Sequence, residues 1–106
     1  MPKYLAKARY NTDGARALMK EGGSARLEAV KKAAKTVGGK VESFYFAYGG
    51  DDAIVIVDMP DENAGLALSL AVNASGTVSL EMVKLITPAE MDAAVQTTVK
   101  YRGPGQ

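Results

Sequence analysis

The 106-residue chain contains no cysteine and no histidine. Without cysteine, a disulfide framework, a thiol nucleophile and an iron–sulfur cluster are excluded. Without histidine, a Ser-His-Asp triad, a histidine general base and a His-ligated haem or zinc are excluded. Among metal ions, only those that prefer oxygen ligands, such as Mg²⁺ or Ca²⁺, could be bound by the side chains of this sequence. We predict no metal site and no cofactor.

The chain also lacks an excess of one charge and a long apolar run. Thirteen Lys and Arg residues are balanced by 12 Asp and Glu residues, for a net charge of +1. This balance gives no electrostatic signature of a partner such as nucleic acid or an anionic membrane. No apolar run approaches the ~18 residues of a membrane-spanning helix, and the first residues lack the pattern of a signal segment. We therefore expect a cytoplasmic protein of bacterial type.

The composition that is present is globular, with 47% hydrophobic and 24% charged residues. A chain of this length suits one domain, which we expect over residues 1–98, followed by a flexible tail at 99–106. Apolar alternation predicts strands over residues 3–10, 41–48, 52–59 and 77–86. Helical spacing predicts helices over residues 15–21, 25–37, 62–74 and 88–99.

The predicted helix ends carry the expected capping residues. Ser24, Asp61 and Thr87 are candidate N-caps, and Glu90 completes a capping box with Thr87. Gly38 ends the second helix as a left-handed cap. The resulting order, β-α-β-β-α-β with a C-terminal helix, predicts an α+β, ferredoxin-like fold in which helices cover one face of a four-stranded antiparallel sheet.

The Gly49-Gly50-Asp51-Asp52 stretch lies between the second and third predicted strands. Two glycines suit a two-residue hairpin turn of type I′ or II′, with Phe44 opposite Val55. This turn would place Phe44, Phe46 and Tyr48 under the helices. An acidic metal site on Asp51 and Asp52 is the alternative, which the opposite orientation of adjacent strand residues disfavours.

Nearly the whole chain resembles the GYD-domain family. The matching segments are YLAKARYNTDGARAL near the start, VGGK at residues 37–40, VESFYFAYGGDDAIVIVDMPD, and ALSLAVNASGTVSLEMVKLITPAEM. Gly49 and Asp52 match the glycine and aspartate of the family's Gly-Tyr-Asp signature, while Asp51 stands in the tyrosine's place. The resemblance implies a small ferredoxin-like domain of the dimeric α+β-barrel type, and it implies no particular activity.

The sheet face away from the helices, which we call the open face, combines apolar and charged side chains. Small Ala6 and Ala8 suit helix packing, which turns their neighbours in the first strand outward. The expected members of the open face are Leu5, Tyr45, Ile54, Ile56 and Val83 together with Lys7, Arg9, Asp52, Asp58 and Glu81. Antiparallel pairing should bring Arg9 near Asp52 and Lys7 near Glu81.

An apolar face of this kind predicts a partner, and we expect a homodimer formed through the open faces, with a higher oligomer as the alternative. We predict a binding or interaction module with a small organic or anionic ligand between the two sheets. The predicted ligand-binding residues are Lys7, Arg9, Tyr45, Asp52, Asp58 and Glu81. The alternative is that the charged side chains of this set form ion pairs with one another inside the dimer interface.

A second function class is a cofactor-free enzyme of the oxygenase or isomerase type, acting on a small organic substrate. Such an enzyme would use Tyr45 and Arg9 with a carboxylate from Asp58 or Glu81.

Overall fold

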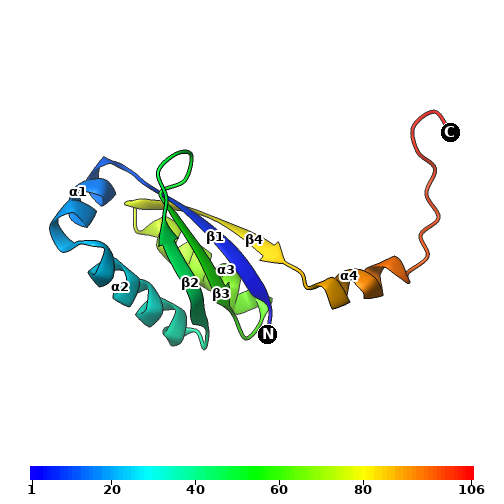
Figure 1. The fold of residues 1–106 in the computed structure, drawn as a ribbon, viewed down its shortest axis with the longest axis horizontal. Coiled ribbons are helices and arrows are strands. Elements are labelled where there is room, and N and C mark those ends of the chain that lie inside the picture. The colour runs from blue at the N-terminus through cyan, green and yellow to red at the C-terminus, as the bar shows by residue number, and fades with distance from the viewer.

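One four-stranded antiparallel sheet with four helices organises the chain, and the computed structural model describes residues 1–106 (Figure 1). The elements in chain order are β1 (Lys3–Tyr10), α1 (Thr12–Glu21), α2 (Gly23–Thr36), β2 (Lys40–Phe46), β3 (Ala53–Asp58), α3 (Glu62–Ala74), β4 (Val78–Leu85) and α4 (Pro88–Val95). The predicted β-α-β-β-α-β order is confirmed, with α1 and α2 both between β1 and β2.

The strands lie in the order β2-β3-β1-β4. Every neighbouring pair is antiparallel. Strands β1 and β2 are joined through α1 and α2, and β3 lies between them in the sheet. Strands β3 and β4 are joined through α3, and β1 lies between them. Interleaving in this way places β1 and β3 at the centre of the sheet and leaves β2 and β4 as its edges.

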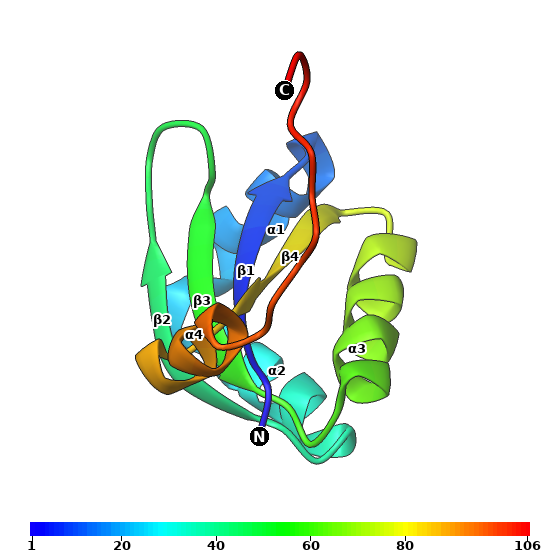
Figure 2. The ribbon, with the colours of Figure 1, turned by 90° about the vertical axis from the view of Figure 1, so that its right-hand side faces the viewer.

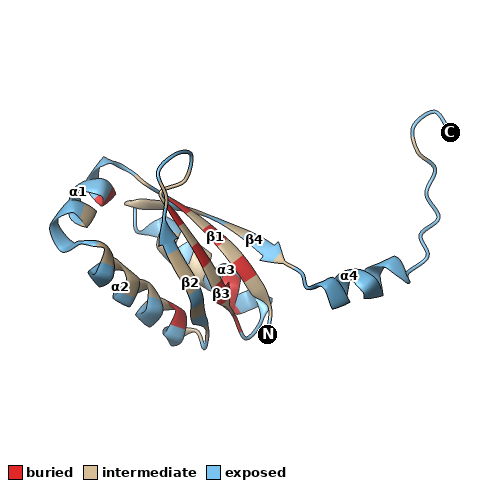
Figure 3. Ribbon diagram, in the orientation of Figure 1, coloured by how far each residue is buried: buried red, intermediate tan, exposed pale blue.

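Helices α2 and α3 cover one face of the sheet, as the alternation of small and large residues predicts. Tyr4, Ala6 and Val55 from the strands are buried in one cluster with Ala34 of α2 and Ala64 of α3. Figure 3 shows buried segments along β1 and β3 and at the end of α2. Lys7 and Arg9 alternate with these buried positions and point to the other side. The prediction of one helix-covered face and one open face is confirmed.

Most helix ends follow the predicted capping chemistry. The side chain of Asp61 accepts from Ala64 N, and Thr87 and Glu90 form the full capping box of α4. Gly38 has φ +79° after α2. The prediction for Ser24 is wrong, because α2 starts at Gly23 with Gly22 as its N-cap.

The first helix is longer than expected. Asn11 is its N-cap and accepts from Gly14 N, so the Asn-Thr-Asp-Gly segment begins a helix rather than separating it from the strand. The close packing of this turn depends on Gly14, since an added Cβ would lie 2.3 Å from the backbone oxygen of Thr77. At the other end of the chain, α4 stops at Val95, four residues before the predicted end.

The hairpin between β2 and β3 keeps the predicted register but not the predicted turn. Phe44 pairs with Val55 as expected. The strands end at Phe46 and Ala53, so residues 47–52 form a wider loop in place of a two-residue turn. Tyr48 is fully exposed rather than covered by helices. The loop opens because Asp51 turns toward β1, where it meets two cationic side chains.

The C-terminal arm, residues 86–106, extends away from the sheet. Figure 2 looks onto the open face and shows α4 in front of it, and Figure 1 shows α4 and the tail projecting to the same side. The arm explains a radius of gyration of 16.9 Å, compared with about 13 Å for a compact chain of this length. Every residue of α4 is exposed.

Candidate functional site

The open face is organised in rows that run across the sheet. One row joins Tyr45, Ile54, Lys7 and Glu81 from β2, β3, β1 and β4 respectively. The next row joins Ser43, Ile56, Leu5 and Val83. A third row contains Asp58, Lys3 and Leu85. The middle row is thus almost entirely apolar, and charged side chains stand on both sides of it.

A group of charged side chains gathers at the loop end of the open face. The ammonium of Lys7 lies 3.8 Å from Asp51 Oδ2 and 3.9 Å from Glu81 Oε2. The Nε of Arg9 donates to Asp51 Oδ1 at 3.4 Å. These residues line an open depression of about 350 Å³, which we call the Lys7–Arg9 pocket; its lining residues are Lys7, Arg9, Asp51, Ser79, Leu80 and Glu81.

The predicted pair of Lys7 with Glu81 is confirmed, and the predicted pair of Arg9 with Asp52 is wrong. Asp51 takes the place expected for Asp52. The side chain of Asp52 accepts from Tyr10 N at 2.8 Å, and its own N–H donates to Ala8 O. Asp52 therefore fastens the loop to the end of β1, and its carboxylate does not join the pocket.

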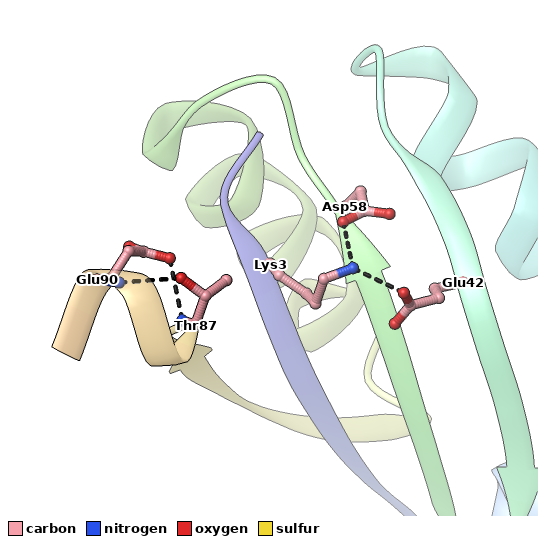
Figure 4. A network of polar contacts seen from close by, with 5 residues as sticks. All are labelled: Lys3, Glu42, Asp58, Thr87 and Glu90. Atoms are coloured by element: carbon pink, nitrogen blue, oxygen red, sulfur yellow. Dashed lines mark hydrogen bonds and ion pairs between the residues drawn. The ribbon is translucent and has the colours of Figure 1, made fainter. Parts of the chain in front are cut away.

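The opposite end of the open face carries a separate cluster of charges (Figure 4). The ammonium of Lys3 donates to Asp58 Oδ1 and Glu42 Oε1, both at 2.8 Å. These two hydrogen bonds, first that to Asp58 and then that to Glu42, raise the pKa of Lys3 above its usual value. Asp58 is thus already paired with Lys3, which precedes Lys7 by four residues in β1.

Tyr45 lies on the open face at edge strand β2, with 72% of its surface exposed. It shares a row with Lys7 but is two strands away, which corresponds to about 9–10 Å between backbones. Within one copy, therefore, Tyr45, Arg9 and Asp58 do not meet around a common point. Arg9 and Glu81 are the two members of the predicted enzymatic set that line the same pocket.

Three residues of these clusters were missed by sequence reasoning: Lys3, Glu42 and Asp51. Lys3 follows the same alternation in β1 as Lys7, and that period of two could have placed it on the open face. Asp51 resembles an exposed turn residue in the sequence, and its contacts depend on how the loop lies across β1. Glu42 sits where the register of β2 and β3 shifts between Val41 and Ser43, and this bulge brings its carboxylate to Lys3. A polar residue that breaks the alternation between Val41 and Phe44 is the signal that could have indicated the bulge.

The chain is an α+β domain with one covered sheet face and one open face that carries charged clusters at both ends. The family model of the GYD domain matches residues 4–95, and the chain belongs to the GYD-domain family. No curated protein and no solved structure gives a significant match. Among its helices, none has both the length and the apolar character needed to cross a membrane.

Proposed function

We propose that the protein is a ferredoxin-like binding module that forms a homodimer through its open faces, closes into a dimeric α+β barrel, and holds a small anionic organic ligand at the Lys7–Arg9 pocket. The interleaved strand order supports the ferredoxin-like assignment. The observation that carries the proposal is the apolar middle row of the open face. A cytoplasmic location stays a prediction from the sequence.

The middle row supports a protein interface because its apolar side chains are only partly covered within the chain, with Leu5 and Ile56 half-buried. Leu5, Ile56 and Val83 come together from three adjacent strands, and Val83 is exposed. An apolar strip bordered by charges on both sides has the composition of an interface core with a polar rim. A two-fold axis through the middle row would bring the same strip of a second copy onto it.

The C-terminal arm gives independent support for a second copy. Met91 and Val95 lie four residues apart on α4, so they share one side of the helix, and they are 49% and 71% exposed. The arm projects to the side of the open face (Figure 2). A second copy packed on that face would lie beside the arm and could cover this apolar stripe.

Substitution in the middle row tests the dimer. We expect Ile56→Lys to shift the wild-type dimer to a monomer, because two buried ammonium groups would meet near the axis. Leu66→Lys is the matched control: Leu66 is an exposed apolar residue on α3, away from the open face. Light scattering should show that the control keeps the wild-type mass. A loss of mass in the control alone would assign the interface to α3 instead.

The ligand part of the proposal rests on two cations that are incompletely neutralised. Lys7 and Arg9 reach the pocket, and their contacts with Asp51 and Glu81 lie between 3.4 and 3.9 Å. Close charge-assisted hydrogen bonds are shorter, about 2.7–2.9 Å. An anionic group of a ligand could therefore form better bonds to Lys7 and Arg9 than the two carboxylates do.

Removal of the competing carboxylate tests the ligand site. With succinate and inorganic phosphate as probes, NMR titration should show several-fold tighter binding to Asp51→Asn, because this change frees both cations. Arg9→Met should weaken binding. Lys3→Met is the control at the other charged cluster and should leave the affinity unchanged. Equal affinities in all four proteins, or no saturable binding, would reject the ligand site and leave the charges as interface ion pairs.

The enzymatic hypothesis has narrower support, namely the presence of Arg9 and Glu81 in one pocket. A complete set would need Tyr45 from a second copy, because the row spacing separates Tyr45 from Arg9 within one copy. Once a substrate is found, turnover that is unchanged in both Tyr45→Phe and Arg9→Ala would exclude this alternative. Assembly beyond a dimer is a further alternative, since Leu66 and Leu70 of α3 are exposed.

A further inference from the structure

The helix-covered side of the sheet contains an apolar cleft between α2 and α3. Its inner part has a volume of about 70 Å³ and rests on Ala6, Tyr10, Val55, Val57, Val78 and Leu80 of the strands. Its outer part, about 280 Å³, opens between the helices. Arg26, Ala33, Leu68 and Val72 line both parts, so the two parts adjoin each other.

The cleft is open because its helical walls are built from small residues. Ala33 of α2 lies across from Ala67 and Ala71 of α3 in the outer part. Protein interiors normally pack to the density of organic crystals, and a lined void forfeits dispersion contacts. A ligand with an apolar body would recover these contacts without displacing any side-chain hydrogen bond.

One charged group stands among these apolar walls. Arg26 is the only charged residue in the lining of either part. Its one ion pair, with Glu21, is at 4.0 Å. The hydroxyls of Thr36 and Ser75 also line the outer part, but each donates to a carbonyl of its own helix. The guanidinium of Arg26 is therefore the main group available to a polar ligand atom.

Tyr10 supplies a second donor beside Arg26. Burial raises the pKa of the Tyr10 hydroxyl, and the nearby guanidinium of Arg26 only partly opposes this effect. The phenol is therefore neutral at physiological pH and keeps its proton to donate. A carboxylate accepts from a guanidinium and a phenol in the same region, whereas a cationic ligand would be repelled by Arg26.

We propose that the α2–α3 cleft is a binding site for a small amphipathic carboxylate, with the carboxylate on Arg26 and Tyr10 and the aliphatic body between the two helices. The site lies on the opposite side of the sheet from the Lys7–Arg9 pocket. It is complete within one copy, so it depends neither on the dimer nor on the anion site of the open face.

A titration series of butanoate, hexanoate and octanoate, followed by ¹H–¹⁵N NMR, tests the site. Amide shifts should concentrate at Ala33, Leu68 and Val72. Affinity should rise about fourfold with each methylene group that enters the cleft. Hexan-1-ol, a neutral molecule of matched chain length, should bind at least about tenfold more weakly than hexanoate, because it lacks the charge-assisted bond to Arg26.

Two variants separate the charge from the cleft. Arg26→Met keeps an apolar stem and should remove the preference for hexanoate over hexan-1-ol. Ala33→Leu should fill both parts of the cleft and abolish binding of both molecules. Lys32→Met removes an exposed cation of the same helix that does not line the cleft, and it should change neither affinity. An unchanged preference in Arg26→Met, shifts confined to the open face, or no saturable binding would overturn the proposal. A change of oligomeric mass in a folded Ala33→Leu protein would overturn it in favour of a protein contact.

Discussion

The side chain of Asn73 on α3 pairs with the backbone of Leu80 on β4, much as a neighbouring strand would. Asn73 Oδ1 accepts from Leu80 N at 2.7 Å, and its Nδ2 donates to Leu80 O at 3.2 Å. The same Nδ2 also donates to Ser69 O at 2.9 Å. Because β4 is an edge of the sheet, these bonds satisfy backbone groups that would otherwise be open to pairing with another chain.

Replacement of Asn73 by Ala should destabilise the protein by about 1–2 kcal/mol, because the edge strand loses its side-chain partner. Chemical denaturation measures the change. Asn63→Ala is the control on the same helix, where the side chain makes no hydrogen bond, and it should have little effect. Equal stabilities of the two variants would mean that water replaces Asn73 at the edge without cost.

The two hairpin glycines should differ in their tolerance of side chains. Gly49 has φ +153°, and Gly49→Val should cost about 1–3 kcal/mol because a β-branched residue resists this conformation. Gly50 has no such φ, and an added Cβ would lie 3.8 Å from Arg9 Nη2, an ordinary contact. Gly50→Ala should therefore be nearly neutral in thermal unfolding. A similar loss in both variants would contradict the assigned backbone.

The neighbouring aspartates should also separate in their effect on stability. Asp52→Ala removes the acceptor of Tyr10 N and should cost about 1–3 kcal/mol. Asp51→Asn weakens ion pairs whose cationic partners are partly or largely exposed, and such pairs contribute about 0–1 kcal/mol. Urea unfolding of both variants checks this order. A larger loss in Asp51→Asn would show that the pocket charges hold the loop in place.

Acid should loosen the start of α4. Hydrogen bonds to the backbone and side chain of Thr87 lower the pKa of Glu90 below its usual value near 4.5 (Figure 4). Because the folded pKa is depressed, the stabilisation is present above the unfolded pKa and is lost as pH falls through the folded pKa. NMR titration of the Glu90 carboxyl carbon in folded and urea-unfolded protein measures the two values.

Substitution by glutamine provides the control for that pH effect. Glu90→Gln retains a side chain that can complete the capping box but removes the titrating group. Amide exchange at the start of α4 should then be insensitive to pH in the acid range after correction for intrinsic rates. A titration of Glu90 at the same pH in folded and unfolded protein would disprove the role of the cap.

The two faces of the sheet could be predicted because their physics is local. Ala6 and Ala8 alternate with Lys7 and Arg9 along one strand, and the period of two assigns each set to its own side. The cap of α4 could be predicted for the same reason, since Thr87 and Glu90 are three residues apart. Short-range spacing therefore determined the order of the elements and the open-face residues in the regular parts of the strands.

The contacts of the loop could not be predicted from spacing. Whether Asp51 or Asp52 meets Arg9 depends on how a glycine-containing loop lies across a strand more than 40 residues earlier in the chain. The α2–α3 cleft was invisible for a related reason: the distance between two helices follows from their packing on the sheet, and neither helix sequence specifies it alone. Long-range packing thus decided the part of the site that the sequence missed.

Sedimentation equilibrium of the wild-type protein over micromolar concentrations tests the proposed dimer most directly. We expect a single species of about twice the 11.1 kDa chain mass, because a second copy would cover both the apolar middle row around Leu5 and Ile56 and the exposed stripe of α4. A species of single-chain mass throughout this range would contradict the proposed dimer. The open face would then be a solvent-exposed surface of a monomer.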